Sequence, residues 1–429
     1  MPPVMLDLKF IKENAEAVKA NIAARFMNAD VDAVIRLYDQ RNALITETDA
    51  LRKKRNDNAK AMKGKLEPEE RQRLIAEGKA IKEQIASKEK EEAEAKLALE
   101  EAASCIPNMA HPDAPVGKED KDNSEVARVG EPTVFDFPAK DHLEIAEDLD
   151  LIDFERGAKV SGSKFYFLKN EAVLLELALT RYALDILRKH GFILTVTPDI
   201  AREEIAAGIG FNPRGEESNI YALEGTGTCL VGTAEITLGG YYAGDIVDLS
   251  KGPIMMAGLS HCFRREAGAA GQYSKGLYRV HQFSKVEMFV YAKPEESDDI
   301  LMKLRSIEEE IFSGLNIPFR VVDTCTGDLG APAYRKFDLE AWMPGRGENG
   351  GWGEVTSTSN CTDFQARRLG IRYKEEGKTR HVHTLNGTAV AISRAIIAVL
   401  ENGQQADGSI AIPEALVPYC GFSSIPAQK

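Results

Sequence analysis

A seven-residue spacing of leucines within a highly charged stretch constrains the fold of this chain more than any other feature. About half of the residues from Arg52 to Glu101 are charged, and the stretch contains no aromatic side chain. Apolar side chains at seven-residue steps form a narrow stripe on a helix, which suits packing against one partner helix better than burial in a wide core. The residues at this spacing or on the same stripe are Leu37, Leu44, Leu51, Leu74, Ile81, Ile85 and Leu99.

A glycine and a proline divide this stretch into two parts. Gly64 is suited to end one helix, and Pro68 is suited to begin the next. We therefore predict helices over about residues 31–62 and 68–103, folded back as an antiparallel two-helix coiled-coil arm. A coiled coil that pairs two copies of the chain is the alternative, but the break and the short seam favour the arm.

The rest of the chain has a different composition. A segment rich in proline and polar residues, 106–134, cannot continue a helix and is predicted to be a linker between an N-terminal domain, 1–105, and a larger domain, 135–429. Strand-like segments joined by short glycine-containing loops predict an α+β fold, in which helices flank an antiparallel β-sheet.

Within the larger domain one helix has clear end signals. It runs from about Glu171 to His190, with basic residues in its last turn and Gly191 after it, and a strand over 192–198 follows and stops at Pro198. The other predicted strands cover about 254–266, 277–292, 319–325, 333–343 and 352–359, and the other predicted helices about 295–314 and 388–402.

Composition excludes several classes of protein. In a chain of 429 residues, 43% hydrophobic content is enough for a sizeable core, and no apolar run approaches the about 18 residues of a membrane-spanning helix. The net charge of −13 opposes general binding to DNA, so a nucleic-acid partner requires a local basic patch. Six scattered cysteines predict no zinc site and a reducing compartment.

The start of the chain shows neither a signal peptide nor a transit segment. With the cysteine pattern this predicts a cytoplasmic protein. A mature plastid or mitochondrial form whose transit peptide has been removed is the alternative.

The common glycine-rich nucleotide motifs are absent from the sequence. The glycines between 345 and 353 lie between two predicted strands and indicate a hairpin turn. His381 and His383 share the period of a strand, but such spacing more often places two rings in unconnected environments than at one metal ion.

Three other segments indicate chemistry. The first, 263–288, reads as two strands joined by a Gly/Ala/Ser loop, and it carries Arg264, Glu266 and Glu287 where charge is costly unless it is paired or faces a ligand. Ion pairs across the two strands are the alternative explanation. In the second segment, Glu354 and the hydroxyls of Thr356 and Ser357 offer oxygen ligands that suit magnesium carried on phosphates.

The third segment, 385–388, leads into a helix that carries Arg394. An ordinary N-cap followed by a surface arginine would explain it equally well when it is considered alone.

Taken together, these segments resemble the three signature motifs of class II aminoacyl-tRNA synthetases, and specifically those of the seryl-tRNA synthetase family in its bacterial and plant-organellar branch. The resemblance covers essentially the whole chain, including the N-terminal hairpin. This sequence departs from the family pattern at Lys275, at Val355–Thr356 and at Thr388. The matching segments are 171–198 for the first motif, 263–288 for the second, 387–400 for the third, and 231–235, 276–283 and 354–361 for the features specific to serine.

This resemblance implies ATP-dependent activation of L-serine with Mg²⁺, followed by transfer of serine to the 3′ end of tRNA(Ser); whether tRNA(Sec) is a second substrate stays open. It assigns Arg264 to the serine carboxylate and the α-phosphate of ATP, and Arg394 to the γ-phosphate. Further ATP contacts are expected from Glu266, Val280, Phe283, Glu354, Val355, Thr356 and Ser357, with Glu354 and Ser357 as the magnesium ligands. The serine pocket is expected to comprise Thr233, Glu235, Arg264, Glu287, Asn386 and Thr388.

The resemblance also implies a homodimer built around residues 171–198 and a tRNA-binding arm. An enzyme that loads an amino acid onto a carrier protein is the alternative within enzymes, but such relatives lack the long hairpin. A coiled-coil tether would leave the larger domain unexplained. The basic residues expected to contact tRNA near the end of the arm are Arg52, Lys53, Lys54, Arg55, Lys60, Lys63 and Lys65.

Overall fold

The computed structural model describes residues 6–64, 66–212, 218–267 and 273–428, which form two compact units. We call them the helical unit, which comprises residues up to Ala23 and Met27–Pro107, and the sheet unit, which comprises Ala24–Phe26 and the chain from Asn108 onward. Each unit is described by itself.

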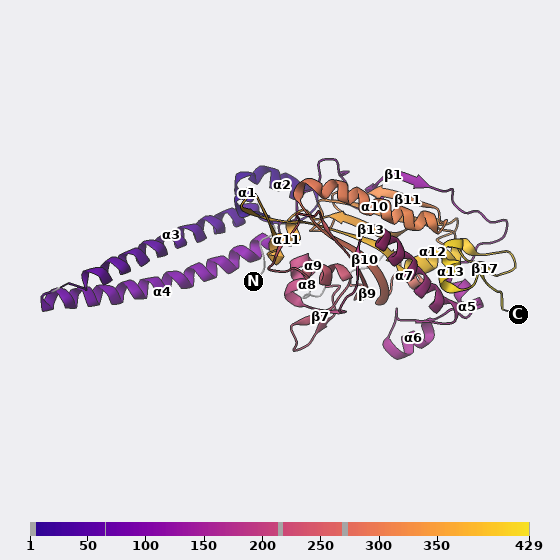
Figure 1. Ribbon diagram of the computed structural model, residues 1–429, viewed down its shortest axis with the longest axis horizontal. Helices are drawn as coiled ribbons and strands as arrows, with labels where there is room; N and C mark the ends of the chain where they lie inside the picture. The colour runs from indigo at the N-terminus through magenta and orange to yellow at the C-terminus, as the bar shows by residue number, and fades with distance from the viewer. Residues whose placement is uncertain (1–5, 65, 213–217, 268–272, 429) are drawn as a thin grey trace. The chain divides into compact units, whose positions relative to one another are not determined.

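The helical unit contains the predicted hairpin. Two long helices, α3 and α4, are folded back on each other (Figure 1), and each begins where its sequence provides a start signal. The Asp30 side chain accepts a hydrogen bond from the backbone N–H of Ala33 at 2.9 Å, and Pro68 is the first residue of α4. The helices of the unit are α1 (Leu8–Glu13), α2 (Ala15–Ala24), α3 (Val31–Ala61) and α4 (Pro68–Ser104).

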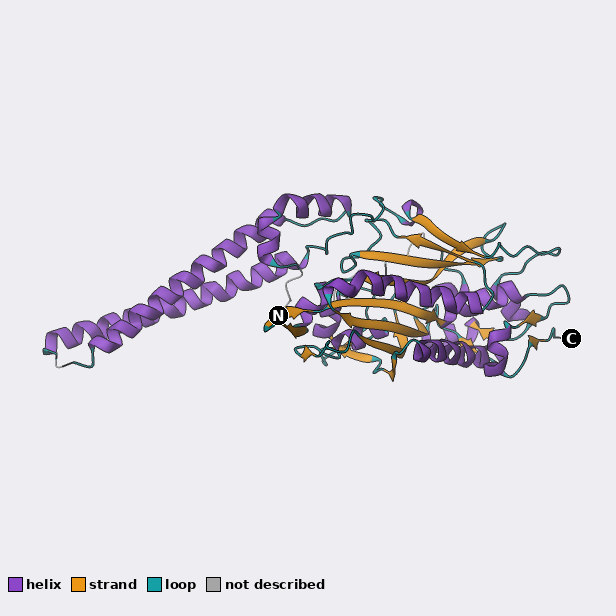
Figure 2. Cartoon of the chain, turned by 45° about the horizontal axis from the view of Figure 1, so that its top comes forward, coloured by secondary structure: helices purple, strands orange, loops and turns teal. Residues whose placement is uncertain are grey.

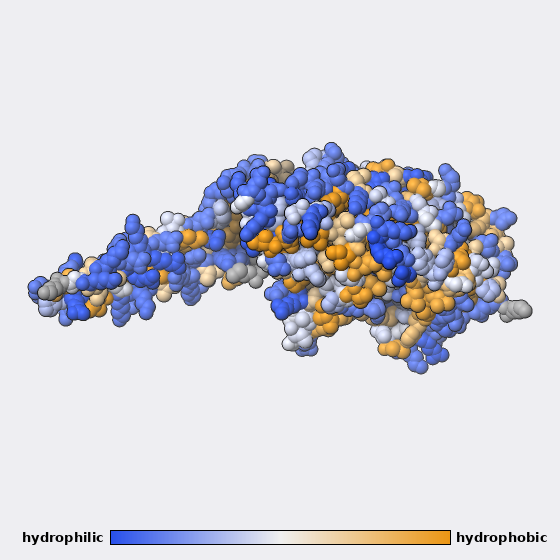
Figure 3. Space-filling model, in the orientation of Figure 1, coloured by the Kyte–Doolittle hydropathy of each residue, from blue (hydrophilic) through white to orange (hydrophobic). Residues whose placement is uncertain are grey.

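Apolar contacts along a narrow seam hold α3 and α4 together. The surface of the hairpin is mainly hydrophilic (Figure 3), and ion pairs cross the seam between Arg52 and Glu89 at 2.9 Å and between Lys88 and Glu47 at 3.0 Å. Such half-exposed pairs contribute at most about 1 kcal/mol each, so the seam depends on its buried side chains. These include Leu44, Thr48, Leu74, Ile81, Ile85 and Leu99.

The sheet unit is built on what we call the main sheet. Among the described residues it has eight strands in the order β1-β11-β12-β13-β16-β10-β9-β4, and all neighbours are antiparallel except β4 and β9, which are parallel. The sheet is therefore mixed at one edge, where we expected antiparallel pairing throughout. Its strands are β1 (Ser124–Val129), β4 (Ile193–Val196), β9 (Ile254–Phe263), β10 (Gln282–Ala292), β11 (Phe319–Asp323), β12 (Arg335–Met343), β13 (Gly351–Asn360) and β16 (His383–Ala391).

Three expected elements differ in the structure. The helix expected from residue 388 begins at Ile392, because Thr388 to Ala391 pair with β10 as part of β16. Pairing with a neighbouring strand outweighs the local helix propensity of this segment. The strand expected from Leu277 begins at Gln282, after a turn of 3₁₀ helix. The segment expected to be a linker contains β1, which pairs with β11.

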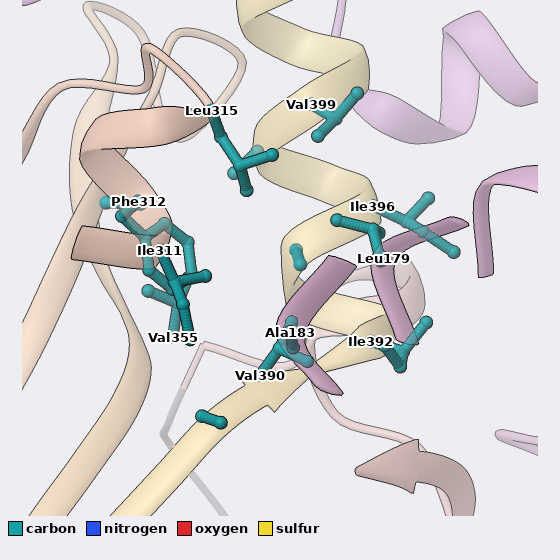
Figure 4. Close-up of a cluster of buried hydrophobic side chains, with 14 of the residues drawn as sticks. Leu179, Ala183, Ile311, Phe312, Leu315, Val355, Val390, Ile392, Ile396 and Val399 are labelled. Carbon is teal, nitrogen blue, oxygen red and sulfur yellow. The ribbon is translucent and has the colours of Figure 1, made fainter. Parts of the chain in front are cut away.

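Long helices cover one face of the main sheet (Figure 2). Alternate side chains of β10, such as Met288 and Val290, belong to the same buried apolar cluster as residues of α7 (Glu171–Lys189), α10 (Ser297–Gly314) and α12 (Ile392–Gly403). Figure 4 shows part of this cluster, with Leu179 of α7 near Ile396 of α12. Burial of each large apolar side chain contributes about 1.5–3 kcal/mol, so this face supplies much of the stability of the unit.

Shorter elements complete the sheet unit. Among the described residues every helix is too short or too polar to cross a membrane. The remaining helices are α5 (His142–Asp148), α6 (Phe154–Ser161), α8 (Glu203–Ile209), α9 (Ala234–Gly240), α11 (Phe364–Leu369), α13 (Val417–Cys420), η1 (Asp120–Asp122), η2 (Gly276–Tyr278), η3 (Pro294–Glu296) and η4 (Glu414–Leu416). The remaining strands are β2 (Ile152–Asp153), β3 (Phe167–Leu168), β5 (Ile200–Arg202), β6 (Ala222–Leu223), β7 (Thr228–Leu230), β8 (Ile246–Val247), β14 (Arg372–Glu375), β15 (Lys378–His381), β17 (Ile410–Ala411) and β18 (Ser424–Ile425).

Candidate active site

The candidate site lies mainly on the face of the main sheet opposite α7 and α10, and the first turn of α12 contributes two residues to it. Side chains alternate along a strand, so Phe283, Lys285 and Glu287 of β10 share this face, while Val286 and Met288 belong to the apolar cluster on the other. The glycine-rich segment between β12 and β13 forms a connection between two antiparallel strands, as expected. A cavity on this face is lined by Arg264, Glu266, Tyr278, Arg279, Val280, Phe283, Lys285, Glu354, Val355, Thr356, Thr388, Ala391, Ser393 and Arg394.

Two arginines from different elements line this cavity. Arg264 follows β9; its Nε donates to the carbonyl of Gly232 at 3.2 Å, and its guanidinium lies 5.3 Å from the centre of the Phe283 ring. Arg394 belongs to α12; its Nη1 donates to the backbone carbonyl of Glu354 at 2.9 Å, and its guanidinium lies 4.6 Å from the centre of the Tyr278 ring. Planar guanidinium groups fixed in this way can bind phosphate or carboxylate oxygens in pairs.

Glu266 sits where the chain leaves β9, in a strained backbone conformation with a φ of 51°. Its Oε2 accepts a hydrogen bond from Arg279 Nη1 at 2.6 Å, and its side chain is 7% exposed. The pair holds the carboxylate in the cavity wall near Phe283, where it can accept a hydrogen bond from an amino group of a stacked ring. Val280, which is buried, lines the same wall.

The structure separates the two hydroxyls that we considered as metal ligands. Ser357 lies opposite Asp338 in the register of β12 and β13, whereas the Thr356 hydroxyl donates to Oε2 of Glu308 on α10 at 3.0 Å. Thr356 therefore directs its hydroxyl toward the helices. Val355 has its side chain in the apolar cluster, so any contact of Val355 with a nucleotide would use its backbone.

The acidic oxygens around Ser357 suit a hard cation. Burial opposes ionisation of Glu354, but the positive charges of Arg394, Lys336 and Arg264 outweigh it and hold the pKa of this carboxyl below its usual range. Oδ1 of Asp338 is buried and has no hydrogen-bond partner among the residues that the structure describes. In the described part of the chain no group of three or more His, Cys, Asp or Glu side chains could hold a metal by itself, but a magnesium ion carried on phosphates needs fewer protein ligands.

A second polar cluster lies around Glu235 at the start of α9; we call it the serine cluster because it contains the residues that the sequence resemblance assigns to the serine pocket. Thr233 is the N-cap of this helix, and its Oγ1 accepts a hydrogen bond from the backbone N–H of Glu235 at 3.2 Å. Oε1 of Glu235 accepts hydrogen bonds from Gln365 at 2.8 Å and from Asn386 at 3.0 Å. Burial, and then the neighbouring charge of Glu287, raise the pKa of Glu235 to about 7.

The other half of the serine cluster spans β10 and β16. Glu287 and Thr388 are paired residues in the register of these strands, and the Thr388 hydroxyl donates to Oε2 of Glu287 at 3.2 Å. The ammonium of Lys285 lies 2.5 Å from the same oxygen and donates to Thr388 Oγ1 at 3.3 Å. Thr388 is thus a strand residue that faces the cluster, and the N-cap alternative is wrong.

Sequence reasoning missed two residues of this cluster. Lys285 shares the strand period of Phe283 and Glu287, so alternation along β10 could have placed it on the polar face. Gln365 lies on α11, and no sequence signal connects it to Glu235. The two histidines that we considered have separate partners, since His381 contacts the carbonyl of Ile371 at 3.3 Å and His383 contacts Ser297 at 2.9 Å.

The basic residues proposed for nucleic-acid binding belong to the helical unit. Arg52 already pairs with Asp49 and Glu89, and Lys60 lies 3.7 Å from Asp57. Lys65 and residues 268–272 of the loop in the second motif lie outside the described residues. The exposed basic residues of this group are Arg52, Lys53, Lys54, Arg55, Lys60 and Lys63.

Comparison with known proteins agrees with this geometry. Residues 229–403 match the family described as tRNA synthetase class II core domain (G, H, P, S and T), and residues 5–110 match the seryl-tRNA synthetase N-terminal domain. A serine–tRNA ligase of Treponema denticola is 72% identical over 423 residues, which cover 98% of this chain and 100% of the relative.

Solved structures agree as well. A seryl-tRNA synthetase of Pyrococcus horikoshii, complexed with ATP, has a TM-score of 0.91 and 40% identity over 99% of this chain and 100% of that one. A cytoplasmic serine–tRNA ligase of Naegleria fowleri, in complex with AMP, has a TM-score of 0.86 and 31% identity over 100% of both chains.

The mixed sheet with helices on one face and two arginines over a polar cavity on the other defines a class II aminoacyl-tRNA synthetase. Within that class, the matches along the entire chain are specific. The chain belongs to the seryl-tRNA synthetase family.

The raised pKa of Glu235 predicts a pH dependence of serine use. We expect Glu235 to bind the ammonium group of serine, which a carboxylate attracts and a neutral carboxyl does not. The kcat/KM for serine should therefore fall about tenfold per pH unit below about pH 7. The charged groups that act on Glu235 are Glu287, Lys285 and Arg264. The measurement is serine-dependent ATP–pyrophosphate exchange between about pH 5.5 and pH 8.5, the range around that pKa.

The variant Glu235→Gln is the matched test of this assignment. It should raise the KM for serine at every pH and abolish the fall below pH 7, while the KM for ATP changes little. A profile for serine that is flat across this range in the unaltered protein would contradict the assignment.

Proposed function

We propose that this chain activates L-serine with ATP and then transfers the seryl group to the 3′ end of tRNA(Ser). The observation that carries the proposal is the placement of Arg264 between two sites, the cavity that contains Phe283 and Arg394 and the serine cluster around Glu235. An arginine there can contact the serine carboxylate and the α-phosphate at once.

Activation joins two anionic groups, so positioning and charge neutralisation supply the catalysis. The serine carboxylate oxygen attacks the α-phosphorus; a new O–P bond forms, the bond to the bridging oxygen of the β-phosphate breaks, and pyrophosphate leaves. Arg264 would hold both reacting groups, Phe283 would stack on the adenine, and Arg394 would neutralise the departing pyrophosphate. No protein nucleophile takes part.

Glu354 and Ser357 would hold magnesium on the ATP phosphates. When it is bound, the ion neutralises charge on the phosphate oxygens. Arg394 is held in place by its contacts with Glu354, and Glu266 accepts a hydrogen bond from the adenine amino group.

Selection of serine rests on buried polar groups. A site built to hydrogen-bond a hydroxyl rejects the analogue that lacks it by about 10⁴ or more, because its own polar groups then stay unpaired. Glu287 and Thr388 are 2% and 7% exposed, so neither can turn to bulk water when alanine is bound. Threonine is excluded by the space for one extra methyl group, which gives a weaker discrimination of about 10–200-fold.

We therefore predict different effects for these two residues. Glu287→Ala should reduce serine activation far more than ATP binding. Thr388→Ala should chiefly raise the KM for serine and reduce the ratio of kcat/KM for serine to kcat/KM for alanine, which we call the serine-to-alanine ratio. Exchange assays with serine, alanine and threonine measure both effects. If the serine-to-alanine ratio were unchanged in both variants, the hydroxyl would be read by other groups.

A homodimer built around residues 171–198 is part of the proposal. Large apolar side chains of α7 and β4 are exposed, and a dimer would cover them as obligate interfaces do. They include Val173, Leu174, Leu177, Ile193, Leu194 and Val196.

The dimer can be tested with one charged substitution on this face. Leu177, which is 61% exposed, should tolerate Leu177→Asp in a folded monomer, yet the variant should shift the protein from dimer to monomer in sedimentation at micromolar concentration. Val134→Asp, at a position 87% exposed on another segment, serves as the control and should leave the dimer intact. An unaltered protein that sediments as a monomer would refute the dimer.

The arm is proposed to bind tRNA through the exposed basic residues of α3 and of the turn that follows it. The supporting observation is a cluster of cations on a chain whose net charge is −13. A cytoplasmic location also belongs to the proposal and is supported by the free thiols of the cysteines.

We predict that Lys53→Ala/Lys54→Ala/Lys63→Ala weakens tRNA binding by on the order of 10-fold or more and reduces its salt dependence, because phosphate contacts are lost. Serine-dependent exchange without tRNA should be unchanged. The control, Lys251→Ala/Lys374→Ala/Lys378→Ala, removes three exposed charges from the sheet unit and should leave tRNA affinity unchanged. An equal loss of tRNA affinity in the two triple variants would show that the basic residues of the arm are not the tRNA-binding site.

A further inference from the structure

Lys285 occupies an unusual position for a lysine. It is 6% exposed, and its ammonium lies between two residues of the serine cluster, 2.5 Å from Glu287 Oε2 and 3.3 Å from Thr388 Oγ1. The Thr388 hydroxyl donates to the same carboxylate oxygen at 3.2 Å. The Lys285 ammonium and the Thr388 hydroxyl therefore both contact Oε2 of Glu287.

The order of side chains along β10 places Lys285 next to the reacting groups. Side chains on one face of a strand follow each other at about 6.6–6.8 Å, so Lys285 stands between Phe283, which would stack on adenine, and Glu287, which would read the serine hydroxyl. Lys285 and Thr388 line the cavity.

The charges of the serine cluster also require a buried cation. Glu235 and Glu287 interact unfavourably with each other, and Lys285 and Arg264 act in the opposite direction on Glu235. A buried carboxylate without a partner is costly, so removal of Lys285 would leave Glu287 poorly stabilised. When serine binds, its ammonium compensates Glu235 and Lys285 continues to compensate Glu287.

We propose that Lys285 is a positioning residue that determines the specificity of the serine site. Its ammonium holds Oε2 of Glu287, so that Oε1 is oriented to accept a hydrogen bond from the serine hydroxyl. Thr388 completes the arrangement from the neighbouring strand. The inference rests on the proposed function, because it assigns a role in choosing serine over alanine.

A structural ion pair is the competing explanation. A Lys285 with only a structural role would support the site for every amino acid. Its loss would then reduce serine and alanine activation alike. Loss of a residue that orients Glu287 reduces the activation of serine alone, because alanine has no hydroxyl to donate a hydrogen bond to Glu287. The serine-to-alanine ratio therefore separates the two roles.

The test uses the full chain with Lys285→Met, which keeps most of the side-chain length and removes the charge. In ATP–pyrophosphate exchange, kcat/KM for serine should fall on the order of 100-fold, the serine-to-alanine ratio should fall at least on the order of 10-fold, and the KM for ATP should stay within about threefold. Lys285→Arg keeps the charge and should lower the serine-to-alanine ratio less than Lys285→Met does.

The control is Lys293→Met, just beyond the end of β10. Lys293 pairs with Glu375 at 2.9 Å, outside the serine cluster, so this variant removes a Lys–Glu pair and should leave the ratio unchanged. The double variant Lys285→Met/Glu287→Gln should be less impaired than the product of the two single effects, because the two residues act as one unit.

The outcomes separate the inference from the proposed function. An unaltered protein without serine-dependent exchange would overturn the proposed function. An active unaltered protein combined with a Lys285→Met variant that keeps the serine-to-alanine ratio would overturn the role of Lys285 alone. If Lys285→Met melts at a much lower temperature, Lys285→Arg and the double variant decide, and strictly multiplicative effects in the double variant would also refute the proposal.

Discussion

The pairing of β10 with β16 is the interaction on which the rest of the site depends. Its register places Glu287 opposite Thr388, and an irregularity in the pairing lies directly beside them, between Val286 and Glu287. Because side chains alternate, a shift by one residue would send Glu287 into the apolar cluster and bring Met288 into the site. The apolar face packed against α7, α10 and α12 therefore fixes the register, and the register fixes the serine cluster.

The two faces of the main sheet thus have different roles in the sheet unit. The helices bury Met288 and Val290 on one face and stabilise the fold, whereas the other face carries charge that would be costly without partners or ligands. Several charged groups there already have partners: Arg394 with Glu354, Arg279 with Glu266, and Lys285 with Glu287. These partners hold the site in place before any substrate binds, so that less order has to be created on binding.

Features with strong local signals could be predicted from the sequence. The heptad spacing and the break at Pro68 predicted the hairpin nearly to the residue, and the cost of charge within a strand predicted that Glu287 is paired or faces a ligand. The start of α12 could not be predicted, because Thr388 to Ala391 join a strand through pairing with a distant segment. Gln365 was missed for the same reason: only the folded chain brings α11 to Glu235, and a local sequence pattern contains no record of such a contact.

We propose that buried polar groups on β10, β16 and α9 bind the hydroxyl and the ammonium group of serine. The most direct measurement is a crystal structure of the full chain with a non-hydrolysable analogue of seryl-adenylate. We expect the serine hydroxyl to lie within about 2.6–3.2 Å of Glu287 and Thr388, and the ammonium group to lie at the same range from Glu235. A hydroxyl bound to other groups, or an ammonium far from Glu235, would contradict it.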